Sequence, residues 1–91
     1  MKLLYKTITA NTQVSTQECY FVGAELSNTA NTYLVVYDES DSSRTATRKV
    51  ANLGVTSYDR FSTMMFPDEG VKMEGIYVWY DEGIGTIYYH Y

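Results

Sequence analysis

The segment "GIYVWYDEGIGTIYYHY", residues 75–91, carries the clearest fold signal in the chain. Five of its seventeen residues are tyrosine, and Trp79 stands among them. β-Branched and aromatic residues of this kind favour strands, so we expect strands at 71–80 and 84–91. The polar stretch 81–83, Asp-Glu-Gly, separates the two strands and predicts a hairpin turn.

Alternation along the predicted hairpin places its side chains on two faces. In the first strand Ile76, Val78 and Tyr80 point one way, while Tyr77 and Trp79 point the other. In the last strand the same rule groups Ile84, Thr86, Tyr88 and His90 against Ile87, Tyr89 and Tyr91. One face of each strand meets the domain core and the other meets solvent or a neighbour. The sequence leaves open which face is which.

Tyrosine and tryptophan are enriched at protein interfaces, where they supply rigid area with a polar tip. The same residues line sugar-binding surfaces, and the sequence does not separate these two uses. The candidate interface residues are therefore the six aromatic side chains of this segment: Tyr77, Trp79, Tyr80, Tyr88, Tyr89 and Tyr91.

Upstream, the chain shows no sustained apolar stripe with helical spacing. Short runs rich in Val, Ile, Thr, Tyr and Phe alternate with polar clusters and predict five further strands: 2–9, 18–26, 32–38, 44–52 and 57–66. The stretch 10–17 reads as a loop, and "PDEG" at 67–70 reads as a turn. Seven closely spaced strands predict one all-β domain over residues 1–91, an antiparallel β-sandwich or a jelly-roll-like fold.

Three of these strands carry further expectations. In strand 18–26, simple alternation groups Tyr20, Val22, Ala24 and Leu26 against Cys19, Phe21 and Gly23. Strand 32–38 is apolar on both faces, which favours a central position. Strand 44–52 is mostly polar, and its Lys and Arg residues suit the edge of a sheet.

Composition narrows the function classes. The formal net charge is −4, and the basic residues form no stripe, which argues against nucleic acid as the main partner. No apolar run approaches the length of a membrane span, and the first residues are too short and polar for a signal peptide. Cys19 is the only cysteine, so we expect a small buried hydrophobe rather than a reactive thiol.

No catalytic or metal-binding motif stands out. The carboxylates of Asp38, Glu39 and Asp41 are the best candidates for a cation site, but they lack the glycine and the further carboxylate of a calcium loop. We therefore interpret this stretch as a solvated hairpin loop. We expect an exposed or interfacial side chain at His90, because no nucleophile or orienting group accompanies it. The sequence predicts no enzyme, no metal and no cofactor.

Three runs of the sequence carry a resemblance to a known family: "YLVVYD" at Tyr33–Asp38, "GIYV" at Gly75–Val78 and "GIGTIYYHY" at Gly83–Tyr91. Together with the polar stretches between them, they resemble small β-sandwich proteins of tailed bacteriophages and prophages over residues 18–91. The resemblance implies a virion structural component: a capsid decoration or cement protein, or part of a fibre or tail. It also implies a trimer or other homo-oligomer held by outer sheet faces and terminal strands, and no active-site residues.

The leading hypothesis is therefore a non-enzymatic virion protein that is made in the host cytoplasm. Its expected partners are the major capsid protein or other virion proteins and further copies of itself. Nucleic acid and membranes are not expected partners. One alternative is a receptor- or carbohydrate-binding module of a tail or head fibre. A further alternative is a small acidic inhibitor of a host defence protein, which the scattered positions of the acids disfavour.

Overall fold

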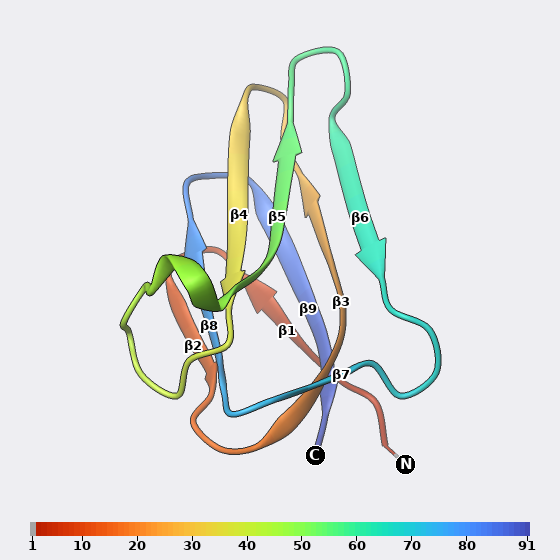
Figure 1. Cartoon of the computed structure of the whole chain (residues 1–91). Coiled ribbons are helices and arrows are strands. Elements are labelled where there is room, and N and C mark those ends of the chain that lie inside the picture. Colours follow the sequence, from red (N-terminus) through yellow and green to blue (C-terminus); the bar gives the residue numbers. More distant parts are fainter. Residues whose placement is uncertain (1) are drawn as a thin grey trace.

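The computed structural model describes residues 2–91 and confirms an all-β sandwich (Figure 1). Its strands form two antiparallel sheets, which we call sheet A and sheet B. In sheet A, β1 (Leu4–Ile8) pairs with β9 (Ile84–His90), β9 pairs with β3 (Cys19–Ser27), and β3 also pairs with β6 (Phe61–Met65) and β7 (Val71–Met73).

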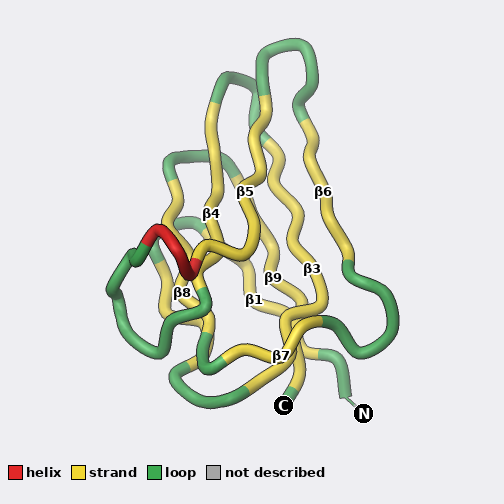
Figure 2. Tube along the Cα trace, in the orientation of Figure 1, coloured by secondary structure: helices red, strands yellow, loops and turns green. Residues whose placement is uncertain are grey.

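Sheet B has the strand order β2 (Thr12–Ser15), β8 (Ile76–Tyr80), β4 (Thr32–Tyr37) and β5 (Lys49–Val55). The apolar strand β4 is central, as predicted. β5 lies at the edge, also as predicted, although it begins only at Lys49. A short 3-10 turn, η1 (Ala46–Arg48), precedes it and is red in Figure 2.

The core lies between the two sheets. Its largest fully buried apolar side chains come from both layers: Ile8, Phe21, Leu26, Met73 and Ile87 from sheet A, and Leu34, Val36, Ile76 and Val78 from sheet B. Full burial of such a side chain stabilises the fold by about 1.5–3 kcal/mol. Cys19 is buried in the same core, which confirms its prediction as a small hydrophobe. Burial raises the pKa of the Cys19 thiol above its ordinary value.

The predicted hairpin of the two last strands is wrong. β8 pairs with β2 and β4 in sheet B, whereas β9 pairs with β1 and β3 in sheet A. The turn at 81–83 is therefore an arch that carries the chain from one sheet to the other. Gly83 serves this arch with a φ of 96°, a conformation that glycine adopts at little steric cost. Each strand is apolar enough to lie inside its own sheet, so each gains two neighbours.

Simple alternation also fails in β3. The register of β3 against β9 shifts between Phe21 and Gly23, which marks a β-bulge. Because the bulge inserts one residue, Cys19 and Phe21 before it and Ala24 and Leu26 after it all point into the core. The sequence had placed Phe21 and Ala24 on opposite faces.

The structure has nine strands in residues 2–91 where the sequence predicted seven. Part of the predicted loop 10–17 forms β2, which pairs with β8. The predicted strand 71–80 is divided into β7 and β8, and the chain crosses from sheet A to sheet B between them. Gly75 lies at this crossing, where a Cβ would collide with the backbone of residues 39–40.

The predicted strand 57–66 begins only at Phe61. Residues 56–60 instead form a turn, in which the Thr56 hydroxyl accepts hydrogen bonds from the backbone N–H groups of Tyr58 and Asp59. The predicted turn at 67–70 is confirmed. Gly70 has a φ of 88° there and donates its N–H to the carbonyl of Pro67.

Candidate functional site

The outer surface of sheet A exposes a row of large apolar side chains. They are Tyr5 on β1, Tyr88 and Ile84 on β9, and Met65 and Phe61 on β6. We call this surface the open face. Four of the five, Tyr5, Phe61, Met65 and Ile84, are between 52% and 71% exposed. Alternation explains the arrangement, because their strand neighbours point into the core.

Strand register brings the open face together across sheet A. Tyr5 lies opposite Tyr88, Tyr88 lies opposite Gly23, and Gly23 lies opposite Met65. This row crosses four strands that are far apart in the sequence (Figure 1). Toward the other end of the sheet, Ile84 and Phe61 flank Ser27 in the same way. A polar row, Thr7, Thr86, Glu25 and Thr63, lies between these two apolar rows.

Gly23 lets Met65 lie across the open face. A Cβ at this position would collide with the Sδ atom of Met65 and would lie 2.6 Å from the carbonyl oxygen of Met64. Methionine is flexible and polarisable, and it adapts to varied partner surfaces. The glycine thus gives the middle of the face a flat, adaptable apolar surface.

Tyr88 is fixed by a polar contact within the open face. Its hydroxyl donates a hydrogen bond of 3.2 Å to Oε2 of Glu25. Partial desolvation raises the pKa of Tyr88 above its ordinary value, and the hydrogen bond to Glu25 raises it further. The hydroxyl is therefore a protonated donor at neutral pH, and Glu25 is the acceptor.

Of the six candidate interface residues, only Tyr88 belongs to the open face. Tyr80 and Tyr89 are half-buried and pack against the core. The Tyr80 hydroxyl donates to the carbonyl of Gly83. Tyr91 is exposed, and its hydroxyl donates to Oγ of Ser15 at 3.1 Å.

The other two candidates, Tyr77 and Trp79, lie on the outer surface of sheet B with Val35 and Tyr37. We call these four residues the covered face. Tyr77 is buried and Trp79 is half-buried. The guanidinium carbon of Arg44, from the loop 38–48, lies 3.7 Å from the centroid of the Trp79 ring. This contact is a cation–π interaction, and it occupies one side of the ring.

Trp79 also has a polar partner on its own sheet. Its Nε1 atom donates a hydrogen bond of 3.2 Å to the hydroxyl of Tyr33, which is itself exposed. The structure thus brings Tyr77 and Trp79 together on sheet B, with Arg44 of the loop 38–48 over Trp79, and away from Tyr88 on the opposite sheet.

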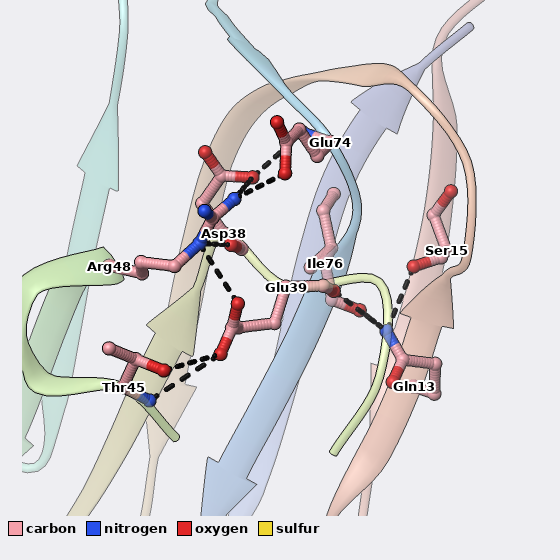
Figure 3. Close-up of polar contacts among 8 residues, drawn as sticks. All are labelled: Gln13, Ser15, Asp38, Glu39, Thr45, Arg48, Glu74 and Ile76. Carbon is pink, nitrogen blue, oxygen red and sulfur yellow. Dashed lines mark hydrogen bonds and ion pairs between the residues drawn. The ribbon is translucent and has the colours of Figure 1, made fainter. Parts of the chain in front are cut away.

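The loop 38–48 is held in place by an ionic cluster around Arg48 (Figure 3). The Arg48 guanidinium lies 2.9 Å from Glu39, 2.6 Å from Glu74 and 3.7 Å from Asp38. The hydrogen bond to Glu74 raises the pKa of Arg48 above its ordinary value. The prediction of a solvated loop is therefore wrong for Glu39, which is buried, while Asp41 is exposed as expected.

A second anchor joins the loop to β2. The side-chain amide of Gln13 donates to the carbonyls of Glu39, Ser15 and Ile76, at 2.9–3.0 Å (Figure 3). On its other side Glu39 accepts a hydrogen bond of 3.0 Å from the Thr45 hydroxyl. Buried polar groups with partners on both sides fix a loop in one position.

The prediction of an exposed or interfacial His90 is wrong. The ring is buried and stacks on Tyr20 at 4.9 Å between centroids. Its Nε2 lies 2.8 Å from the carbonyl oxygen of Glu69, and its Nδ1 lies 3.1 Å from that of Tyr91. His90 therefore ties the end of β9 to the turn 67–70.

Sequence reasoning missed most of the open face, although a signal was present. The run "FSTMM" at 61–65 has period two and places Phe61, Thr63 and Met65 on one side. Tyr5 gave no such signal, because the sequence does not show which strand pairs with the first strand. The segment 75–91 has the highest density of aromatic residues and therefore favoured Tyr77 and Trp79, which are buried and half-buried in the structure.

The open face is suited to binding another surface through aromatic, thioether and aliphatic contacts. Within residues 2–91, no group of three or more His, Cys, Asp or Glu side chains is placed to hold a metal ion. No helix in the described part of the chain is long and apolar enough to cross a membrane. Comparisons with models of protein families, with curated proteins and with solved structures find no match for this chain.

Proposed function

We propose that the protein is a non-enzymatic structural component of a bacteriophage virion, and most specifically a decoration or cement protein that binds the capsid surface. The observation that carries the binding role is the open face, a set of large exposed apolar side chains that extends across sheet A from β1 to β6. The assignment to a phage virion rests on the resemblance carried by residues 18–91.

The open face has the composition of an interface centre. Patches of exposed aromatic and methionine side chains mark sites of protein contact more often than isolated surface hydrophobes do. The threonines that separate them, at positions 7, 63 and 86, add hydroxyls without introducing charge. One charged group, the Glu25 carboxylate, lies between Thr63 and Thr86 on this face, and it has the Tyr88 hydroxyl as a hydrogen-bond partner.

The direct test of the proposal is the composition of purified particles. We expect mass spectrometry of virions from the phage or induced prophage that encodes the chain to find it in many copies for each particle. Immunogold labelling should place it on the capsid. Its absence from purified virions, with presence in the infected cell, would overturn the virion assignment.

Self-association is the second part of the proposal, with a trimer as the expected state. Small domains often gain stability by oligomerising, because association adds to a modest core. Sedimentation equilibrium of the purified protein should show a mass that is a multiple of the single chain. A monomer across the micromolar range would remove self-association from the proposal and leave capsid binding to be tested separately.

A carbohydrate-binding role is the second candidate, and Tyr5 supports it. This side chain is 71% exposed beside Tyr88, which resembles the flat platform on which a sugar ring stacks. Trp79 offers less support, because a sugar would have to displace Arg44 from its ring. A glycan array with the wild type and with Tyr5→Ala decides the matter: hits that disappear in the variant favour sugar binding.

The acidic-inhibitor alternative gains no specific support from the structure. Asp38, Glu39 and Glu74 surround Arg48, so three carboxylates are partly neutralised within the protein. A mimic of nucleic acid needs clustered negative charge that is free to face a basic partner.

A further inference from the structure

One recess adjoins the open face where Ile84 and Phe61 flank Ser27. It has a volume of about 390 Å³ and is lined by Ser27, Asn28, Thr29, Arg60, Gly83 and Ile84. Its walls come from the β3–β4 turn, the β5–β6 turn and the arch between β8 and β9. These segments are far apart in the sequence, and the fold brings them together at one end of the sandwich.

The walls of the recess are fixed by backbone contacts. The Asn28 N–H donates a hydrogen bond of 3.1 Å to the carbonyl oxygen of Arg60. Gly83 approaches Ser27 and Asn28 so closely that a Cβ would collide with the carbonyl oxygen of Ser27. The recess is therefore a feature of the folded backbone and does not depend on flexible side chains alone.

Arg60 supplies the charged hydrogen-bond donors of the recess. Its Nε donates to the carbonyl of Ser57 at 3.3 Å. Within residues 2–91 its two Nη atoms have no ion-pair partner and no hydrogen bond, since the ion pairs there all involve Arg48. An arginine with free Nη donors matches the two oxygens of a carboxylate. The exposed side chain of Ile84 provides an apolar wall beside it.

We propose that this recess binds a carboxylate that a partner protein presents next to an apolar side chain. The occupant is a partner's chain end, whose terminal carboxylate binds Arg60 while the apolar side chain of its last residue packs on Ile84. Phosphate is the weaker fit, because its sites gather several cations or the backbone N–H groups of a helix N-terminus, whereas Arg60 is the one cation among the lining residues and no helix begins there. The inference rests on the proposed protein-binding role of the open face. It specifies the chemical group by which the partner binds at the Ile84 and Phe61 end of that face.

The test uses N-acetyl-leucine as the probe and N-acetyl-leucinamide as its uncharged match. In a titration followed by amide NMR shifts, we expect the acid to move the signals of Asn28, Thr29, Gly83 and Ile84, with millimolar affinity. Such weak binding is consistent with one ion pair and one side-chain contact. The amide should bind at least about tenfold more weakly, as expected when a charge-assisted hydrogen bond is lost.

Arg60→Gln should abolish the shifts, and Arg60→Lys should weaken them, because lysine keeps the charge but loses the paired donors. Lys72→Gln, a matched loss of charge on β7, should bind as the wild type does. Equal shifts with the acid and the amide, no shifts at all, or equal shifts with inorganic phosphate would each overturn the inference. This titration uses no capsid, so its result stands apart from the virion test: the recess fails alone if the protein is found on capsids but does not bind the acid.

Discussion

The two outer faces of the sandwich both carry aromatic side chains, but they differ in what covers them. On sheet B the side chains of Val35, Tyr37 and Tyr77 are at most 9% exposed. On sheet A the exposed fraction of Tyr5 is 71%. Aromatic content therefore does not itself mark an interface, because a chain can bury one such face within its own fold and leave the other free.

The difference arises from the connection between β4 and β5. Residues 38–48 form a long loop that lies beside β2 and β8 (Figure 1), and the ionic cluster of Arg48 holds it there. Arg44 of this loop then reaches the Trp79 ring. In the described part of the chain, no segment covers Tyr5 and Met65 in the same way, as their exposure shows.

The largest expected difference in stability is between two variants that each lose one tyrosine, one from each outer face. Tyr77→Ala removes a buried ring from the covered face and should lower the free energy of unfolding by about 3 kcal/mol. Tyr5→Ala removes an exposed ring and should change it by less than about 0.5 kcal/mol. Urea unfolding of both variants measures the contrast, and equal losses would show that the two faces do not differ.

A smaller effect comes from the two glycines that lie on opposite outer faces. Gly23→Ala forces Met65 aside and crowds the backbone of Met64, so we expect a loss of about 1–3 kcal/mol in unfolding free energy. At Gly54 a new Cβ would have 3.9 Å of clearance, so Gly54→Ala should be neutral or slightly stabilising. Thermal unfolding of the pair tests whether Met65 is held against Gly23.

The loop 38–48 should become more mobile when Arg48, which holds it by ion pairs, is replaced. Arg48→Met leaves the buried Glu39 carboxylate without its cation, so the loop should open more often. We expect amide hydrogen exchange in residues 38–48 to become roughly tenfold faster or more, as loss of charged hydrogen bonds implies. The exposed Lys49→Met is the control and should leave these rates unchanged.

The smallest expected effect is a pH-dependent contribution of Asp41 to the stability of the fold. Hydrogen bonds from the Ser43 side chain and backbone lower the pKa of Asp41. A carboxylate with a lowered folded-state pKa adds stability above its unfolded pKa, near 3.8, and loses it as the pH falls through the folded value. Asp41→Asn should therefore be slightly less stable than the wild type at pH 7, and the gap should close in acid. A constant gap from pH 7 down to acid would contradict this assignment.

The fold class followed from residue pattern, because strand composition and turn residues predict a sandwich without knowledge of pairing. The failures share one physical cause, which is that pairing is set by contacts distant in sequence. The bulge at Phe21–Gly23 depends on β9, and the arch at 81–83 depends on the partners that β8 and β9 find in different sheets. Likewise, the burial of His90 depends on Tyr20 and on the carbonyl of Glu69.

The candidate site was harder to predict, since exposure belongs to the assembled sheets. Alternation correctly separated Tyr77 and Trp79 from Ile76 and Val78. It did not show that loop 38–48 would cover the first pair. Nor did it bring Tyr5 beside Tyr88, because that neighbourhood joins the first strand to the last.

Reconstitution with capsid shells tests the proposal that the open face of sheet A is the binding surface. Capsid shells from a phage that lacks the gene would be mixed with wild-type protein, with Tyr5→Ser/Met65→Ser, and with Tyr58→Ser, whose ring is 98% exposed and is not one of the five side chains of the open face. We predict that the wild type and Tyr58→Ser sediment with the shells, while the double variant binds at least about tenfold more weakly at unchanged stability. Equal binding by the double variant would contradict the claim.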